Sequence, residues 1–166
     1  MARPRRELAG PVRESVWDYP RPPRLEPSDR RVRILVGSET VVDTHDAVRV
    51  LETSHPPGWY VPFEAVSGSA RLQPVSRTTV CEFKGRAVYW TIVTDSDGAE
   101  AAAWSYPEPT AGFEELRDRF TVYPGRVTAC YVDNERVLPQ QGGFYGGWIT
   151  PDVAGPFKGG DGTWGW

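Results

Sequence analysis

The chain has 166 residues and a net charge of −3, and its 39% hydrophobic and 25% charged residues are typical of one soluble globular domain. The acidic balance argues against a nucleic-acid partner, and no apolar run approaches the roughly 18 residues that a membrane span needs. Two cysteines are too few for a disulfide framework, and no apolar stretch follows the basic N-terminus. We therefore expect a reduced, cytoplasmic protein.

The first predicted region is a Pro-rich arm over residues 1–28. The stretch "SVWDYPRPPRLEP" (15–27) is expected to be extended, because proline fixes its own φ and restricts the residue before it. Trp17 and Tyr19 would then point to the same side. Free linkers rarely carry such aromatic residues, so we expect the arm to lie on the domain.

The second region, residues 29–141, is predicted to be a β domain. "RVRILVGSETVVDT" (31–44) alternates apolar and charged residues on either side of a "GSE" turn, which indicates a hairpin. "AVRVLET" (47–53) is a further strand. Its alternation places Val48, Val50 and Glu52 on one face.

The segments 81–93 and 99–107 are predicted to form a three-stranded antiparallel meander. Asp97-Gly98 is a strong signal for a two-residue turn, and Lys84-Gly85 is a weaker one. This register pairs Cys81 with Val88 and Tyr89 with Tyr106. It puts Tyr89, Trp104 and Tyr106 on one side of the sheet. The other side takes Cys81, Phe83, Val88, Trp90 and Ile92. A slip of one residue would invert the assignment.

The only predicted helix is "GFEELRDRF" (112–120), in which three apolar residues recur at helical spacing. "RVTACYVDNERVLP" (126–139) is predicted to be a last hairpin, turning at Asp133-Asn134. The third region, 142–166, combines many glycines with three tryptophans. We expect this tail to be docked, because exposed tryptophan lowers solubility.

Five motifs in order carry a resemblance to a known family: "SVWDYPRPPRLEP", "RVLETSHPPGWYVP", "CEFKGRAVYW", "AAWSYPEP" and "FTVYPGRV". Together they resemble a bacterial and fungal family, the domain of unknown function four-two-seven, which carries the label nucleotidyltransferase. The resemblance covers about residues 14–138. The Gly/Trp-rich tail looks like an extension found in an actinobacterial branch.

The resemblance implies a mainly β fold, an antiparallel β-tent (Mss4-like) domain, to which our pattern analysis adds one short helix. Relatives of that fold include zinc-binding proteins, methionine sulfoxide reductases and the aromatic-cage ligand domain of cereblon. The family brings no established catalytic residues with it.

Neither phosphoryl-transfer nor zinc chemistry is well supported by the residues. Nucleotidyltransferases hold two Mg²⁺ ions with carboxylates spaced i and i+2, whereas Asp43 and Asp46 are three apart and point to different faces of a strand. A tetrahedral zinc site would need Cys81, Cys130 and both histidines, without any of the usual paired spacing. We therefore expect no metal and no cofactor.

Two polar sites remain as candidates for catalysis. Cys81 could be a nucleophile with Lys84 or His55 beside it, but the predicted register places it among apolar residues, where cysteine is usually inert. Glu52 could be a base with a perturbed pKa and His55 its neighbour, or it could simply end a strand before a stiff "HPPG" turn.

The aromatic residues of the meander form either a core or a cage for a flat or cationic small molecule. We predict a pocket with "LETSHPPGWYVP" (51–62) as one wall and the meander as the other. Its expected ligand-binding residues are Glu52, His55, Tyr60, Lys84, Tyr89, Trp104 and Tyr106.

Three hypotheses follow from this reading. The first is a metal-free domain that binds an unidentified small molecule, and the second is an enzyme that uses Glu52 or Cys81. The third is a protein-interaction module that uses the Pro-rich arm and the tail. We expect a monomer or a homodimer.

Overall fold

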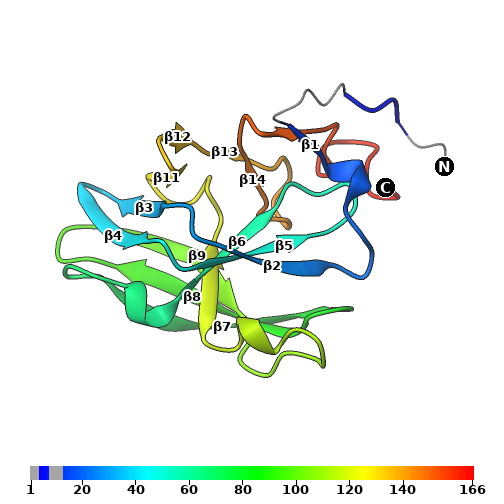
Figure 1. The fold of residues 1–166 in the computed structure, drawn as a ribbon. Helices are drawn as coiled ribbons and strands as arrows, with labels where there is room; N and C mark the ends of the chain where they lie inside the picture. Colours follow the sequence, from blue (N-terminus) through cyan, green and yellow to red (C-terminus); the bar gives the residue numbers. More distant parts are fainter. Residues whose placement is uncertain (1–3, 8–12) are drawn as a thin grey trace.

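The computed structural model describes residues 4–7 and 13–166. Two antiparallel sheets of seven and four strands form the body, and two short two-stranded pairs flank them (Figure 1). The described residues form no α-helix, and their helical turns are three 3-10 turns, η1 (Val16–Asp18), η2 (Phe63–Ala65) and η3 (Glu114–Leu116). The prediction of a mainly β, antiparallel fold is confirmed, whereas the predicted helix is wrong.

The order of neighbouring strands in the two larger sheets differs from their order in the chain. The seven-stranded sheet runs β2 (Arg24–Ser28), β5 (Ala47–Leu51), β6 (Gly58–Pro62), β10 (Arg119–Val122), β9 (Gly98–Ser105), β8 (Gly85–Val93) and β7 (Arg71–Cys81). The four-stranded sheet runs β12 (Glu135–Arg136), β11 (Ala129–Val132), β3 (Val32–Val36) and β4 (Glu39–Thr44). The pairs are β13 (Leu138–Pro139) with β14 (Trp148–Ile149), and β1 (Glu14–Ser15) with β15 (Val153–Ala154).

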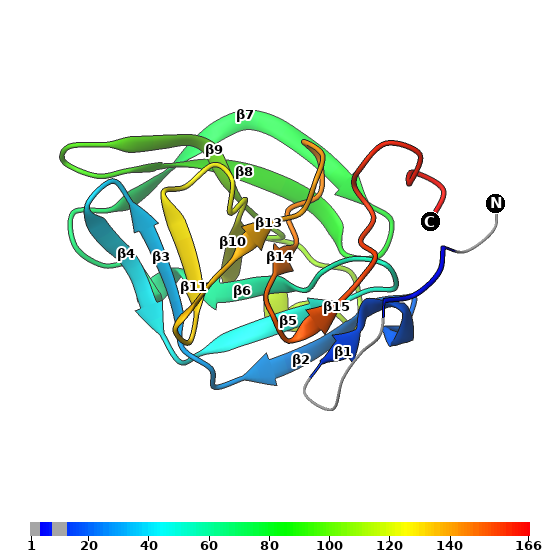
Figure 2. The same ribbon diagram turned by 90° about the horizontal axis from the view of Figure 1, so that it is seen from above.

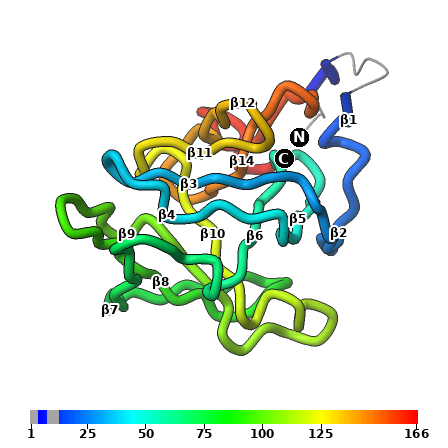
Figure 3. The backbone as a smooth tube through the Cα atoms, turned by 60° about the vertical axis from the view of Figure 1, so that its left-hand side comes forward, coloured from blue at the N-terminus to red at the C-terminus, as the bar shows by residue number. Residues whose placement is uncertain are grey.

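The two sheets lie in separate layers, with β3, β4, β11 and β12 on one side and β7, β8 and β9 on the other (Figure 3). Strand alternation decides which residues fill the space between them. On β6, Trp59 and Val61 pack in this inner core, whereas Tyr60 points to the opposite face. The seven-stranded sheet therefore carries an apolar cluster on each face. The cluster on the face of Tyr60 is called the outer cluster, and that face the outer face.

The predicted hairpins at residues 31–44 and 126–139 are confirmed. β3 pairs with β4 across Gly37-Ser38, with Glu39 of the "GSE" stretch already in β4, and β11 pairs with β12 across Asp133-Asn134. Asp133 adopts a positive φ of 54°, a conformation that Asp tolerates better than most residues.

The meander register is wrong at the turn between β8 and β9, but the predicted aromatic grouping is right. Val93 pairs with Gly98, so the connection is a four-residue loop and not the Asp97-Gly98 turn. A bulge at Ala101, with a φ of 47°, then brings Tyr89 opposite Trp104 instead of Tyr106. The register at this pair differs from the prediction by two residues. An even difference keeps side chains on the same face, so Tyr89, Trp104 and Tyr106 do cluster.

The turn between β7 and β8 also differs, and here the faces change. Cys81 pairs with Gly85 instead of Val88, because the loop holds three residues, 82–84. A shift of three residues is odd, so it moves Cys81 and Phe83 to the face that carries Tyr89. Trp90 and Ile92 pack with the inner core instead. The prediction that placed all five residues on one side is wrong.

The segment predicted as a helix contains the single turn η3 followed by strand β10. Phe113 and Leu116 pack with the outer cluster, whereas Phe120 packs with the inner core. Phe120 pairs with both β6 and β9 in the centre of the sheet. This pairing outweighs the local helical pattern.

The N-terminal and C-terminal segments lie against each other and against the sheet (Figure 2). The stretch 15–27 is not extended throughout, because η1 interrupts it before β2 joins the large sheet. Trp17 and Tyr19 are both buried in a cluster with Val153. The Trp17 indole donates to the Pro156 carbonyl at 2.9 Å. Trp148 is fully buried in the inner core.

Candidate functional site

A cavity of about 460 Å³ lies on the outer face of the seven-stranded sheet. Its walls come from the turn after β5, from β6, from the β7–β8 hairpin and β9, and from the C-terminal segment. The cavity brings together all of the residues predicted to bind a ligand, together with Cys81: Glu52, His55, Tyr60, Lys84, Tyr89, Trp104 and Tyr106.

Hydrogen bonds within the turn and from the C-terminal segment hold the wall formed by "LETSHPPGWYVP" in place. Ser54 adopts a φ of 71°, and the His55 amide donates to the Glu52 carbonyl at 3.1 Å. The C-terminal segment fixes the turn from outside, since the Lys158 amide donates to the Ser54 carbonyl and the Trp148 amide donates to Pro57, both at 2.8 Å. The turn therefore holds Glu52 and His55 at the edge of the cavity.

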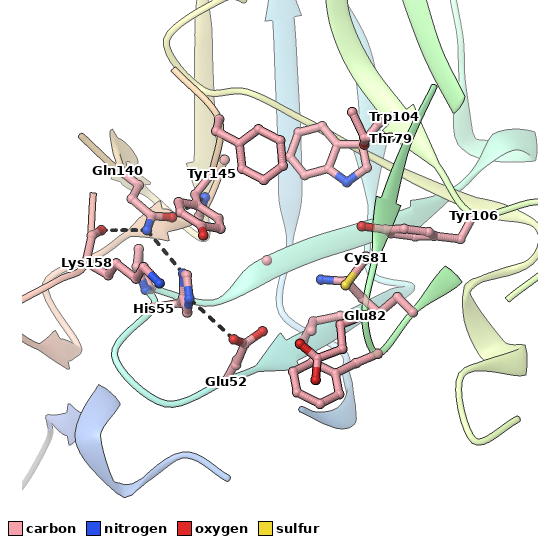
Figure 4. A pocket seen from close by; sticks show the side chains of 18 of the residues that line it. Glu52, His55, Thr79, Cys81, Glu82, Trp104, Tyr106, Gln140, Tyr145 and Lys158 are labelled. Carbon is pink, nitrogen blue, oxygen red and sulfur yellow. Dashed lines mark hydrogen bonds and ion pairs between the residues drawn. The ribbon is translucent and has the colours of Figure 1, made fainter. Parts of the chain in front are cut away.

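A chain of polar side chains crosses this wall (Figure 4). The Gln140 amide nitrogen lies 2.6 Å from the Lys158 carbonyl and 3.3 Å from Nδ1 of His55. Nε2 of His55 lies 3.4 Å from Oε2 of Glu52. The same carboxylate oxygen is 3.4 Å from Nε of Arg21.

This chain determines the tautomer of His55. The Gln140 side chain cannot be flipped, because its oxygen accepts from the Gly147 amide at 2.9 Å while its nitrogen donates to Lys158. Nδ1 of His55 must therefore accept, and the ring proton lies on Nε2, facing Glu52. Both ring nitrogens are thus engaged by the protein.

Glu52 is held in its ionised form. Burial of the side chain disfavours the charge, but the hydrogen bond from His55 and the positive charges of Lys84 and Arg21 outweigh burial and keep the pKa of Glu52 below its usual value. A carboxylate with a lowered pKa is a weak general base.

The far wall is aromatic (Figure 4). The Tyr60 ring meets Trp104 edge-on at 6.5 Å and lies 6.3 Å from Tyr106. Burial raises the pKa of both tyrosines, so their hydroxyls stay protonated. Trp104 packs in turn on Tyr123, with ring centroids 4.5 Å apart. These contacts fix the rings in place beside the empty volume.

The two cysteines differ in their surroundings. Cys130 is buried in the inner core, and burial raises the pKa of its thiol. Cys81 is half-buried and lines the cavity. No described histidine is placed to activate it, because both nitrogens of His55 are engaged and His45 does not line the cavity.

The carboxylates considered for phosphoryl transfer lie elsewhere. Asp43 forms two hydrogen bonds with Arg31 at 2.8 and 2.7 Å, and Asp46 pairs with Arg119 at 2.7 Å. Neither aspartate lines the cavity. Within residues 4–7 and 13–166, no group of three or more His, Cys, Asp or Glu side chains is placed to hold a metal ion.

Sequence reasoning missed Gln140 and the residues that the tail contributes. Gln140, Tyr145 and Lys158 all line the cavity, and the ring of Tyr145 meets His55 edge-on at 4.8 Å. The signal was present in "GGFYGGW" (142–148), where aromatic residues alternate with glycines. Gly146 shows why a glycine is needed next to these rings, because a Cβ at this position would lie 2.8 Å from Cζ3 of Trp104 and 2.9 Å from Tyr123.

The fold and site can now be compared with known proteins. The family model described as Domain of unknown function (DUF427) matches residues 24–133, which is more than half of the chain. The protein therefore belongs to the DUF427 family. No curated protein gives a significant match. No helix in the described part of the chain is long and apolar enough to cross a membrane.

Proposed function

We propose that the protein binds a small planar molecule in the cavity between the "LETSHPPGWYVP" wall and the aromatic wall. The observation that carries this proposal is an open volume of about 460 Å³ bordered by fixed aromatic rings and a fixed polar chain. Ligand sites usually combine an apolar lining with a few oriented polar groups. Tyr60, Trp104 and Tyr106 would supply stacking surfaces, and Lys84 and Glu52 would supply the polar contacts.

Binding is better supported than acid–base catalysis. A general base needs a free lone pair and a pKa near neutral pH. Glu52 does not meet the second requirement, because its pKa is lowered, and His55 does not meet the first, because it uses both nitrogens within the protein. Nucleophilic catalysis by Cys81 would need an activating group, and because His55 is not free to act as one, only Lys84 is left for that role. We also propose, from two antiparallel sheets packed around one core, that the fold is of the β-tent type and works without a metal.

The proposal is tested with a neutral planar probe, naphthalene-2-carboxamide, by ligand-observed NMR. We expect Trp104→Ala to weaken binding at least tenfold, because the ring forms part of the aromatic wall. Trp164→Ala is the matched control, since Trp164 is 81% exposed and does not line the cavity. It should bind the probe as the unmodified protein does.

A second variant protects the test against misfolding. Tyr145 lies on the tail and is 37% exposed, so Tyr145→Ala should leave the sheets intact while removing one side of the cavity. Circular dichroism reports the fold of each variant. The proposal is wrong if the unmodified protein does not bind the probe, or if the folded Trp104 and Tyr145 variants bind it unchanged.

A further inference from the structure

We propose that the ligand carries a carboxylate, which pairs with the ammonium group of Lys84. This inference rests on the proposed binding function and specifies the class of ligand, a planar aromatic acid. It is carried by the position of Lys84, by the pairing of the other charges around it, and by the ring beneath it.

The loop that carries Lys84 is fixed from outside the cavity. The Thr110 amide donates to the Lys84 carbonyl at 3.2 Å, and the Thr110 hydroxyl donates to the Phe83 carbonyl. Gly85 follows with a φ of 107°, and a Cβ there would lie 3.2 Å from the Glu108 carbonyl oxygen. The loop thus packs closely against residues 108–110, while the half-buried Lys84 lines the cavity.

Other charged groups in the cavity already have partners. Arg21 and His55 both approach Oε2 of Glu52 at 3.4 Å. Lys158 donates to the Trp166 carbonyl at 3.4 Å and lies over the Tyr145 ring at 5.3 Å. Glu82 is exposed, and no described carboxylate lies within 4.0 Å of the Lys84 ammonium.

Lys84 has a different environment. Among the described residues its ammonium forms no hydrogen bond or ion pair, and it lies over the face of Tyr106, at 5.5 Å from the ring centroid. The charge of Lys84 acts on the Glu52 carboxylate, but the two groups are not in direct contact. The ammonium can therefore still take a ligand carboxylate as its direct partner, because much of the cost of removing it from water has already been met on folding.

The same contact argues against a cationic ligand. An aromatic cage attracts a cation through the negative face of each ring. Here Lys84 occupies the face of Tyr106, so a second cation would meet like charge at short range. A single ammonium also suits a carboxylate better than a phosphate, which proteins usually hold with several donors or a bidentate arginine.

The test uses three planar probes of the same shape: naphthalene-2-carboxylate, naphthalene-2-carboxamide and naphthalene-2-carboxamidine. At neutral pH they carry a negative, zero and positive charge. In the unmodified protein we expect the carboxylate to bind about tenfold more tightly than the carboxamide, since a charge-assisted hydrogen bond is about twice as strong as a neutral one. The amidine should bind most weakly.

Lys84→Met should abolish the preference for the carboxylate, so that the carboxylate and the carboxamide bind alike, whereas Lys84→Arg should retain the preference. Arg86→Met is the matched control. It removes a positive charge from the same hairpin, but Arg86 is exposed and does not line the cavity. Its preference should equal that of the unmodified protein.

The outcomes separate the two proposals. If no probe binds, the binding function itself is wrong. If the carboxamide or the amidine binds as tightly as the carboxylate, or if folded Lys84→Met keeps the preference, the carboxylate inference is wrong while the pocket stands. An equal loss of preference in the Arg86 variant would show that net charge, and not Lys84, attracts the anion.

Discussion

Trp59 and Tyr60 are neighbours in the chain, but they lie in two very different environments. Trp59 faces the inner core, where aliphatic side chains and Trp148 fill the space between the sheets. Tyr60 faces the outer cluster, where rings and polar groups leave about 460 Å³ open. The same strand thus supplies a closed core on one side and a cavity wall on the other.

The difference lies in what each side chain is packed against. The inner face buries valine, isoleucine and alanine, which can interdigitate without voids. The outer face combines large rings in edge contacts with the charged side chains of Lys84 and Glu52. Closing the space beside these two side chains would remove their charged groups from water, which is costly. The comparison indicates that the inner face provides most of the stability and that the outer face provides the site.

The strongest test of this contrast is the removal of Trp148. The side chain is fully buried, and its indole donates to the Val122 carbonyl at 3.1 Å. We expect Trp148→Ala to lower the free energy of unfolding by about 3–5 kcal/mol, measured by urea denaturation. Trp164→Ala should change it by less than about 0.5 kcal/mol. A small loss for Trp148 would mean that the tail contributes little to the inner core.

A smaller effect is expected where the tail meets the cavity wall. Gly146→Ala would place a methyl group against Trp104 and Tyr123, so we expect a loss of about 1–3 kcal/mol and weaker binding of the naphthalene probes. Gly143→Ala is the matched control, because nothing lies within 4 Å of its Cβ position. Identical behaviour of the two variants would contradict a close contact between the tail and the aromatic wall.

The strand pattern could be predicted from sequence because burial imposes a two-residue period, and this is why the hairpins and the grouping of Tyr89, Trp104 and Tyr106 were found. Loop length carries no such period. The bulge at Ala101 and the three-residue loop before Gly85 depend on contacts with distant segments, and these shifted the register. Cys81 was therefore placed on the wrong face.

Part of the candidate site was also beyond local reasoning. Glu52 and His55 could be proposed because they stand at a strand end among prolines. Gln140 could not, because its role depends on a bond to a histidine 85 positions away in the chain. Periodicity does not report such contacts.

The smallest expected effect concerns Glu52 and depends on pH. Its pKa in the folded protein is lower than the ordinary value of 4.5, because the hydrogen bond from His55 and the charges of Lys84 and Arg21 outweigh burial. A lowered pKa stabilises the fold above the pKa of the unfolded chain, and this contribution is lost as pH falls through the folded pKa. Glu52→Gln should therefore cost about 1 kcal/mol at pH 7, since a charge-assisted hydrogen bond becomes a neutral one.

Urea denaturation at neutral pH and at steps below pH 4.5 measures this effect, with Glu115→Gln reporting the removal of an exposed carboxylate. The gap between the unmodified protein and Glu52→Gln should narrow as the medium becomes more acidic. A gap that widened would show that burial governs Glu52. In that case the pKa of Glu52 in the folded protein would be raised and not lowered. Glu52 would then again be a candidate general base.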